Sequence, residues 1–247
     1  MHTYRWLALS LLLLASPAWA AIAHDNTNSS SQTGTNTLTF SHTCTGSNLM
    51  LIVSAPAEDS TAADRLVSSI TYGGVAMTEV DNRPSGGVQT ANQWYLIGPA
   101  TGANDVVITW GGNVTAGVGI ATSLTGVAQQ APEAEGEGSG TGGSPITCTV
   151  TTVTANAWVI DGAVIADPNK ALTPGAGQIE RAEVQDGGPN VNTIVTTEGP
   201  VASPAATVMS NTWVNNNRDW GTVASAYAAA PEGNKIYNGS INGATLQ

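Results

Sequence analysis

Few residues of this 247-residue chain could carry out catalysis. Catalysis of the Ser–His–Asp type needs a histidine that can act as a base. His24 lies in a polar stretch, and His42 leads into the turn at Cys44, where a packing or hydrogen-bonding role is expected. The chain has no G-x-S-x-G elbow. We therefore predict no catalytic histidine.

Carboxylates could serve a glycosidase, which needs two of them roughly 5–9 Å apart. Glu133, Glu135 and Glu137 alternate as they would on one face of a strand, but their neighbours are glycine and alanine. Residues 130–144 therefore read as a solvated loop. Glu180 and Glu183 fall on opposite faces of a predicted strand and do not converge. We predict no catalytic residue and expect that the protein is not an enzyme.

The two cysteines, Cys44 and Cys148, are expected to pair in a disulfide if the protein is exported. A zinc site is a poor alternative because it needs about four ligands. We expect no cofactor and no metal ligand set. A structural calcium stays open, since carboxylates occur in four loops without a D-x-D-x-D-G pattern. These loops contain Glu58 and Asp59, Asp81 and Asn82, residues 133–137, and Asp167 with Asn169.

Two tryptophans, Trp213 and Trp220, are the candidates for stacking on a sugar ring. They flank a polar turn at residues 215–218. Packing in the core is nevertheless the expected role of most tryptophans of the chain, because they lie in apolar strand contexts.

Residues 1–20 have the pattern of a secretory signal peptide. Arg5 precedes an apolar run, and Ala18-Trp19-Ala20 offers a cleavage site. We expect a secreted protein, extracellular or periplasmic, with no membrane span after cleavage. Asp and Glu number 18 against 7 Lys and Arg. This acidic balance argues against a nucleic-acid partner, which would need clustered positive charge.

Residues 66–80 contain the clearest structural signal, a two-residue turn at Gly73-Gly74. Pairing across it puts Ile70, Tyr72, Val75 and Met77 on one face of a hairpin, which we expect to be buried.

Short strands with turn signals between them follow along the chain, without a long helical pattern. They include a continuous apolar run at residues 49–53, expected to be buried on both faces. The pattern predicts an all-β fold, an antiparallel β-sandwich of jelly-roll-like form, over residues 37–230. We expect a polar, extended or loosely ordered arm at residues 21–36 and a polar tail at residues 231–247.

Several turn and core segments resemble a β-sandwich module of uncharacterised exported bacterial proteins and of phage- or virus-associated structural proteins. These segments are residues 40–48, 70–77, 94–97 with Pro99 and Gly102, and 124–127 with Pro132. The resemblance covers most of the chain after residue 20. It implies a sandwich on an extracellular or particle surface and no catalytic residue.

We therefore expect a non-enzymatic surface, adhesive or assembly module. Its partners would be components of a cell surface or particle, including further copies of itself. The alternative is a carbohydrate-binding, lectin-like module or a sandwich related to glycosidases. An exposed aromatic platform would favour that alternative, whereas unpaired edge strands would favour assembly.

Overall fold

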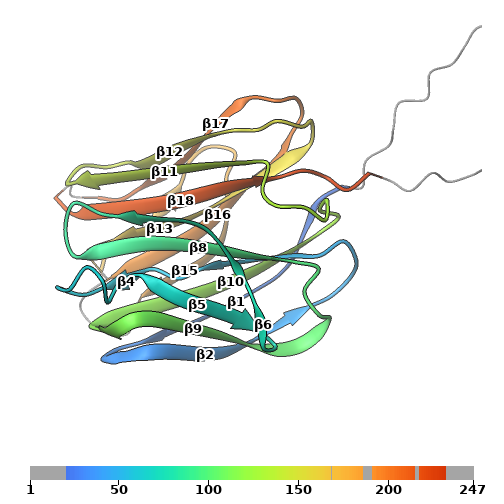
Figure 1. Ribbon diagram of the computed structural model, residues 1–247. Helices are drawn as coiled ribbons and strands as arrows, with labels where there is room; N and C mark the ends of the chain where they lie inside the picture. Colours follow the sequence, from blue (N-terminus) through green and yellow to red (C-terminus); the bar gives the residue numbers. More distant parts are fainter. Residues whose placement is uncertain (1–20, 168, 186–190, 215–216, 232–247) are drawn as a thin grey trace, which may run out of the picture.

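The computed structural model describes residues 21–167, 169–185, 191–214 and 217–231 (Figure 1). The described residues form antiparallel strands without a helix, which confirms the predicted all-β sandwich. The predicted signal peptide and all but the first residue of the predicted tail lie outside these ranges.

The strands form two units in succession. The first unit comprises β1 (Ala23–Gln32), β2 (Thr35–Cys44), β3 (Met50–Ser54), β4 (Ala57–Glu58), β5 (Val67–Tyr72), β6 (Val75–Ala76), β7 (Thr78–Pro84), β8 (Gln89–Ile97), β9 (Gly102–Val114) and β10 (Ala116–Thr125). Its inner sheet has the order β1-β10-β3-β8, with β7 also on β8 and β4 paired with both β8 and β10. Its outer sheet has the order β2-β9-β5-β6.

The second unit repeats this order. It comprises β11 (Ala134–Thr141), β12 (Ile146–Thr151), β13 (Ala157–Ile165), β14 (Thr173–Pro174), β15 (Ile179–Gln185), β16 (Asn192–Val201), β17 (Ala206–Thr212) and β18 (Asp219–Tyr227). Its inner sheet is β11-β18-β13-β16-β15 and its outer sheet is β12-β17-β14. In each unit the first and last strands are neighbours and successive strands divide between two sheets, as in a jelly roll.

The correspondence between the units extends to single residues. In the first unit β7 bulges after Glu79, which pairs with Trp94. In the second unit β15 bulges after Glu180, which pairs with Thr196. Trp94 and Thr196 therefore occupy equivalent positions. A β-bulge is a regular feature of a fold rather than a defect, so a bulge at the same place supports the equivalence of the two units. The span predicted as one sandwich thus contains two sandwiches of the same topology.

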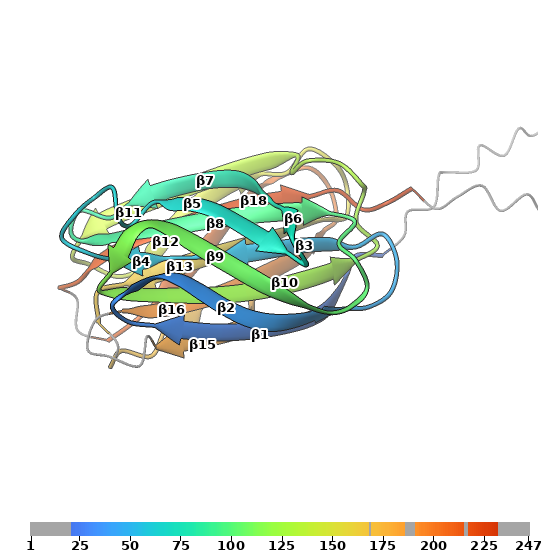
Figure 2. The ribbon, with the colours of Figure 1, turned by 60° about the horizontal axis from the view of Figure 1, so that its bottom comes forward.

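The two units pack through their inner sheets into a stack of four sheets (Figures 1 and 2). Strand β3 is buried on both faces, as predicted. Its residues Leu51 and Val53 join the core of the first sandwich, whereas Met50 and Ile52 join a middle core that includes Ile160 of the second unit. Burial of apolar area at about 25 cal/mol per Å² therefore stabilises both the units and their association.

The hairpin at Gly73-Gly74 is confirmed. Thr71 pairs with Ala76 and Tyr72 with Val75, and both glycines have positive φ, 55° and 81°. Ile70, Tyr72 and Met77 are buried as expected. Val75 is 55 % exposed, because it belongs to the two-residue strand β6 at the end of the outer sheet.

Two segments expected to be irregular are strands. Residues 23–32 of the predicted polar arm form β1, which pairs with β10 along its length. Of the two expectations for this arm, the extended one is correct there and the loosely ordered one is wrong, because an edge strand needs no apolar pattern when both its faces are partly exposed. Residues 134–141 of the predicted acidic loop form β11, paired with β18.

Candidate functional site

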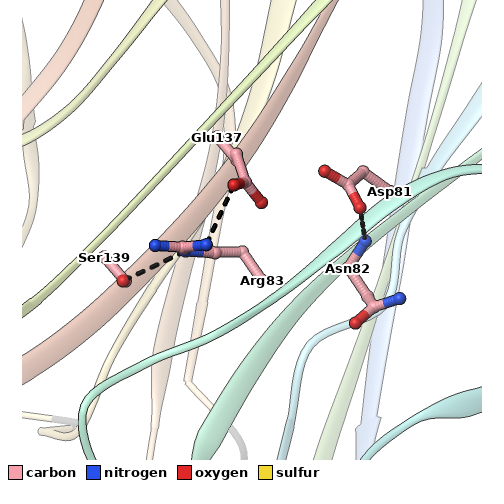
Figure 3. Close-up of polar contacts among 5 residues, drawn as sticks. All are labelled: Asp81, Asn82, Arg83, Glu137 and Ser139. Atoms are coloured by element: carbon pink, nitrogen blue, oxygen red, sulfur yellow. Dashed lines mark hydrogen bonds and ion pairs between the residues drawn. The ribbon is translucent and has the colours of Figure 1, made fainter.

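Carboxylates gather where the edge strands of the two inner sheets meet, β7 against β11 (Figure 3). Arg83 on β7 reaches across to β11, where its Nη1 lies 2.9 Å from Glu137 Oε1 and its Nε donates to Ser139 Oγ at 3.1 Å. Partial burial raises the pKa of Glu137; Arg83 opposes this effect and the Asp81 carboxylate adds to it. Both ion-pair side chains are about 40 % exposed, so the pair serves as a weak link between the units.

Other carboxylates named from the sequence also have protein partners. Glu133 caps the turn after β12, accepting from the backbone N–H of Val153 at 2.8 Å and from the Thr154 hydroxyl at 2.8 Å. Asp59 accepts from the Thr115 hydroxyl at 2.9 Å, and Asp167 pairs with Arg218 at 2.8 Å. Within the described ranges, no three His, Cys, Asp or Glu side chains are grouped so that they could hold a metal ion.

A polar network inside the first sandwich joins Asp25, Ser123 and His42. Ser123 Oγ donates to Asp25 Oδ2 at 2.7 Å, and His42 Nε2 lies 3.1 Å from the same hydroxyl. Since the only hydroxyl proton of Ser123 goes to the carboxylate, His42 must donate through Nε2. Thr45 holds the carboxylate from the other side, through its N–H at 2.8 Å and its hydroxyl.

This network contains the three residue types of a catalytic triad in the wrong order. In a triad the histidine lies between the acid and the serine and takes the serine proton. Here the serine lies between, and the histidine is a donor. Burial lowers the pKa of His42 to about 4, and its Nδ1 is buried with no hydrogen-bond partner among the described residues. The arrangement stabilises the contact between β1, β2 and β10 and cannot activate Ser123.

A second buried network lies inside the second sandwich. Asp161 of β13 is 1 % exposed, and its Oδ2 accepts from Asn211 Nδ2 at 2.9 Å. Its Oδ1 accepts from the Thr196 N–H at 3.2 Å and from the Thr196 hydroxyl. Burial raises the pKa of Asp161 to about 6, against the effect of these hydrogen bonds. Gln178 extends the network, because its Nε2 donates to Thr196 Oγ1 at 3.3 Å.

The internal repeat shows that neither network is required by the fold. The strand pairs Val53–Trp94 and Asp161–Thr196 are equivalent, since Trp94 and Thr196 follow from the shared bulge. Asn211 corresponds likewise to Ile108, since each lies in an outer-sheet strand two residues before a tryptophan, Trp213 directly after β17 and Trp110 within β9. The first unit is thus apolar where the second has Asp161, Thr196 and Asn211.

The converse holds for the network of the first unit. The same register puts Val150 at the position of His42 and Ala226 at that of Ser123. Both are fully buried in the second sandwich. Each unit therefore has buried polar side chains at places that its counterpart fills with apolar ones, His42 and Ser123 in the first unit and Asp161, Thr196 and Asn211 in the second. The two networks that contain them are the candidate functional sites. Only the pattern of the repeat could have revealed them from the sequence.

The predicted disulfide is wrong. Cys44 and Cys148 are free and buried in the cores of different sandwiches. Cys44 ends β2 and Cys148 lies in β12, so they belong to the two outer sheets, which the two inner sheets separate. Burial raises the pKa of the Cys44 thiol and raises that of Cys148 to about 12, which disfavours the reactive thiolate form of both.

The candidate stacking residues are also buried. Trp213 is 6 % and Trp220 is 9 % exposed, and both pack with Ile146 and Ile165 in the second sandwich. Neither offers a flat face to a sugar, so the carbohydrate-binding alternative loses the residues on which it depended.

No protein-family model matches the chain, and no curated protein sequence matches it. Within the described residues, no helix has the length and apolar character to cross a membrane.

Proposed function

We propose that this protein is a non-enzymatic, secreted assembly module that associates with further copies of itself on a cell or particle surface. The proposal rests on two equivalent edge strands, β2 and β12, which pair on one side only among the described strands and contain no charged residue and no proline. In the described part of the chain, each pairs with a single neighbour, β9 or β17. The other backbone edge of each strand has no ladder partner there. At that edge of β12, Gly136 and Gly138 of β11 lie close to the Thr149 and Thr147 carbonyl oxygens, so a further strand would have to displace β11.

Exposed edges are usually protected by lysine, proline or inward-pointing charge. Neither β2 nor β12 contains a lysine, arginine, aspartate, glutamate or proline. Their outward residues are mainly threonine, which favours strand conformation. The strands lie in the two outer sheets, at opposite sides of the four-sheet stack. Strand addition at both would join one molecule to two others, as an assembly requires.

Light scattering after size-exclusion chromatography tests the proposal. The wild-type protein should self-associate as its concentration rises. Thr39→Lys in β2 and Thr149→Lys in β12 should each weaken association, and the double variant should be monomeric. Both threonines are exposed, so the fold should tolerate the changes.

Thr101→Lys, in an exposed turn, is the control for charge. The chain has a net charge of −11, so added lysine reduces repulsion between copies and by itself would favour association. Loss of association only in the strand variants would therefore identify the edges. A wild-type protein that stays monomeric at all concentrations, or equal effects of all three single variants, would contradict the proposal.

A further inference from the structure

The side-chain amide of Gln178 lies in an unusual setting between the two sheets of the second sandwich. Its Oε1 accepts from two backbone N–H groups, that of Gly175 at 2.8 Å and that of Ser210 at 3.1 Å. Two N–H donors directed at one carbonyl oxygen stabilise the negative charge that develops there when a nucleophile attacks the carbonyl carbon. The amide oxygen is thus held in a small oxyanion hole, one of whose donors, the Gly175 N–H, is shared with the Ser210 carbonyl oxygen at 2.7 Å.

The hydroxyl group of Thr196 lies beside the Gln178 amide and is hydrogen-bonded to a base, the Asp161 carboxylate. Thr196 Oγ1 is 3.3 Å from Gln178 Nε2, one covalent bond from the carbonyl carbon Cδ. The same hydroxyl donates its proton to Asp161 Oδ1. A nucleophile bonded to a base, with the base oriented by a third group, is the arrangement of covalent catalysis, and Asn211 is that third group here.

We propose that Thr196 and Gln178 form an intramolecular ester cross-link with release of ammonia. Asp161 takes the proton of the Thr196 hydroxyl as Oγ1 attacks Cδ of Gln178. The negative charge moves to Oε1, where the Gly175 and Ser210 N–H groups stabilise it. The C–N bond then breaks, and Asp161 returns the proton to the departing nitrogen as ammonia. Atoms and electrons balance without an oxidant or co-reactant.

The surroundings of these groups favour the step. Thr196 is completely buried and Asp161 nearly so, so water competes poorly for the hydroxyl. Burial brings the pKa of Asp161 to about 6, near the pH at which a general base works best. The first unit lacks the whole arrangement, because Val53 and Trp94 stand where the second has Asp161 and Thr196.

The bond would join residue 178, just before β15, to β16, while Gly175 and Ser210 attach the same amide to the outer sheet. A glutamine that served only to satisfy backbone donors would need neither the hydroxyl nor the buried carboxylate. The cross-link would therefore stabilise the second sandwich as a covalent bond between two parts of the chain, which is the role of a disulfide in other proteins.

Mass spectrometry of the intact, folded protein tests the inference. The protein should have a mass lower by one ammonia than its sequence requires. Proteolysis should release a peptide containing residue 178 linked to one containing residue 196, and hydroxylamine should separate them. Full, unmodified mass after incubation of the folded protein from about pH 5 to about pH 8 would overturn the proposal. Loss of ammonia located at other residues would overturn it equally.

Variants identify the roles of the residues. Thr196→Ser should retain the cross-link, whereas Thr196→Val and Gln178→Leu should abolish it. Asp161→Asn should slow its formation at least tenfold. Thr197→Val is the matched control, since Thr197 is the next residue, is also buried and bonds Arg181 instead. Gln178 is only partly buried, so its variant should fold even if Thr196→Val does not. Ammonia loss that persists in Gln178→Leu would refute the assignment.

Discussion

Replacement of His42 by valine should change how stability depends on pH. His42 is fully buried, and burial lowers its pKa from 6.5 to about 4. The unfolded chain therefore binds a proton below pH 6.5 that the folded protein does not, and the free energy of unfolding falls as the pH drops toward 4. At about 1.4 kcal/mol for each pH unit between these values, the loss amounts to about 3 kcal/mol.

Asp161 acts in the opposite direction over the same range. Burial raises its pKa from 3.8 to about 6, so its contribution is present below pH 3.8 and is lost as the pH rises through about 6. The same conversion gives about 3 kcal/mol. The two effects nearly cancel in the wild-type protein. His42→Val removes only the first, so the free energy of unfolding should fall as the pH rises from about 4 to about 6.

Urea unfolding at about pH 4, 5, 6 and 7 measures this dependence. Valine is the matched replacement, because Val150 fills the equivalent place in the second unit. Asp161→Val, which copies Val53 at the equivalent place in the first unit, should show the reverse slope, with stability that falls as the pH drops. If wild type and His42→Val share one pH profile, His42 is not buried in its neutral form and the reasoning fails.

Three further predictions concern the cysteines, the buried Asp161–Asn211 pair and the exposed ion pair. Alkylation of the denatured, unreduced protein should modify both Cys44 and Cys148, and a linked pair would contradict their assignment to separate cores. Asp161→Val alone should lower the free energy of unfolding by about 3 kcal/mol, because it leaves the Asn211 amide without its acceptor. Adding Asn211→Ile should recover part of that loss. Additive losses in urea unfolding would show that the two side chains do not interact. Arg83→Met should lower stability by less than about 1 kcal/mol, since its ion pair is exposed, and a larger loss would mean that the contact between β7 and β11 holds the units together.

The strands of this protein were predictable wherever alternation or an apolar run accompanied a turn. The hairpin at Gly73-Gly74 and the strand at residues 49–53 are examples. Strand β11 was missed because its glycines resemble a loop. A Cβ on Gly136 or Gly138 would lie 2.4 or 2.1 Å from carbonyl oxygens of β12, and one on Gly140 would meet the Trp220 ring at 2.6 Å. The glycines allow β12 and Trp220 to approach the backbone of β11 closely. Their alternation with Glu135, Glu137 and Ser139 was the pattern that could have indicated a strand.

Neither the repeat nor the two polar networks could be predicted from local sequence patterns. The two units share few identical residues, and their equivalence follows from strand order, from bulges and from pairs such as Trp110 and Trp213. The disulfide was expected because pairing was inferred from compartment alone, which says nothing of where two strands lie. His42 and Asp161 look like ordinary strand residues until their neighbours in space are known.

The adjacency of the first and last strands in each unit has a consequence for how the two units are joined. In each unit the chain begins and ends at the same edge of the inner sheet, where β1 pairs with β10 and β11 pairs with β18. Two such units therefore need only a short joining segment, here residues 126–133. The two halves nevertheless depend on each other, because either one alone would expose the apolar inner face that contains Ile52 or Ile160. A chain cut between them should therefore yield fragments that aggregate unless they find each other again.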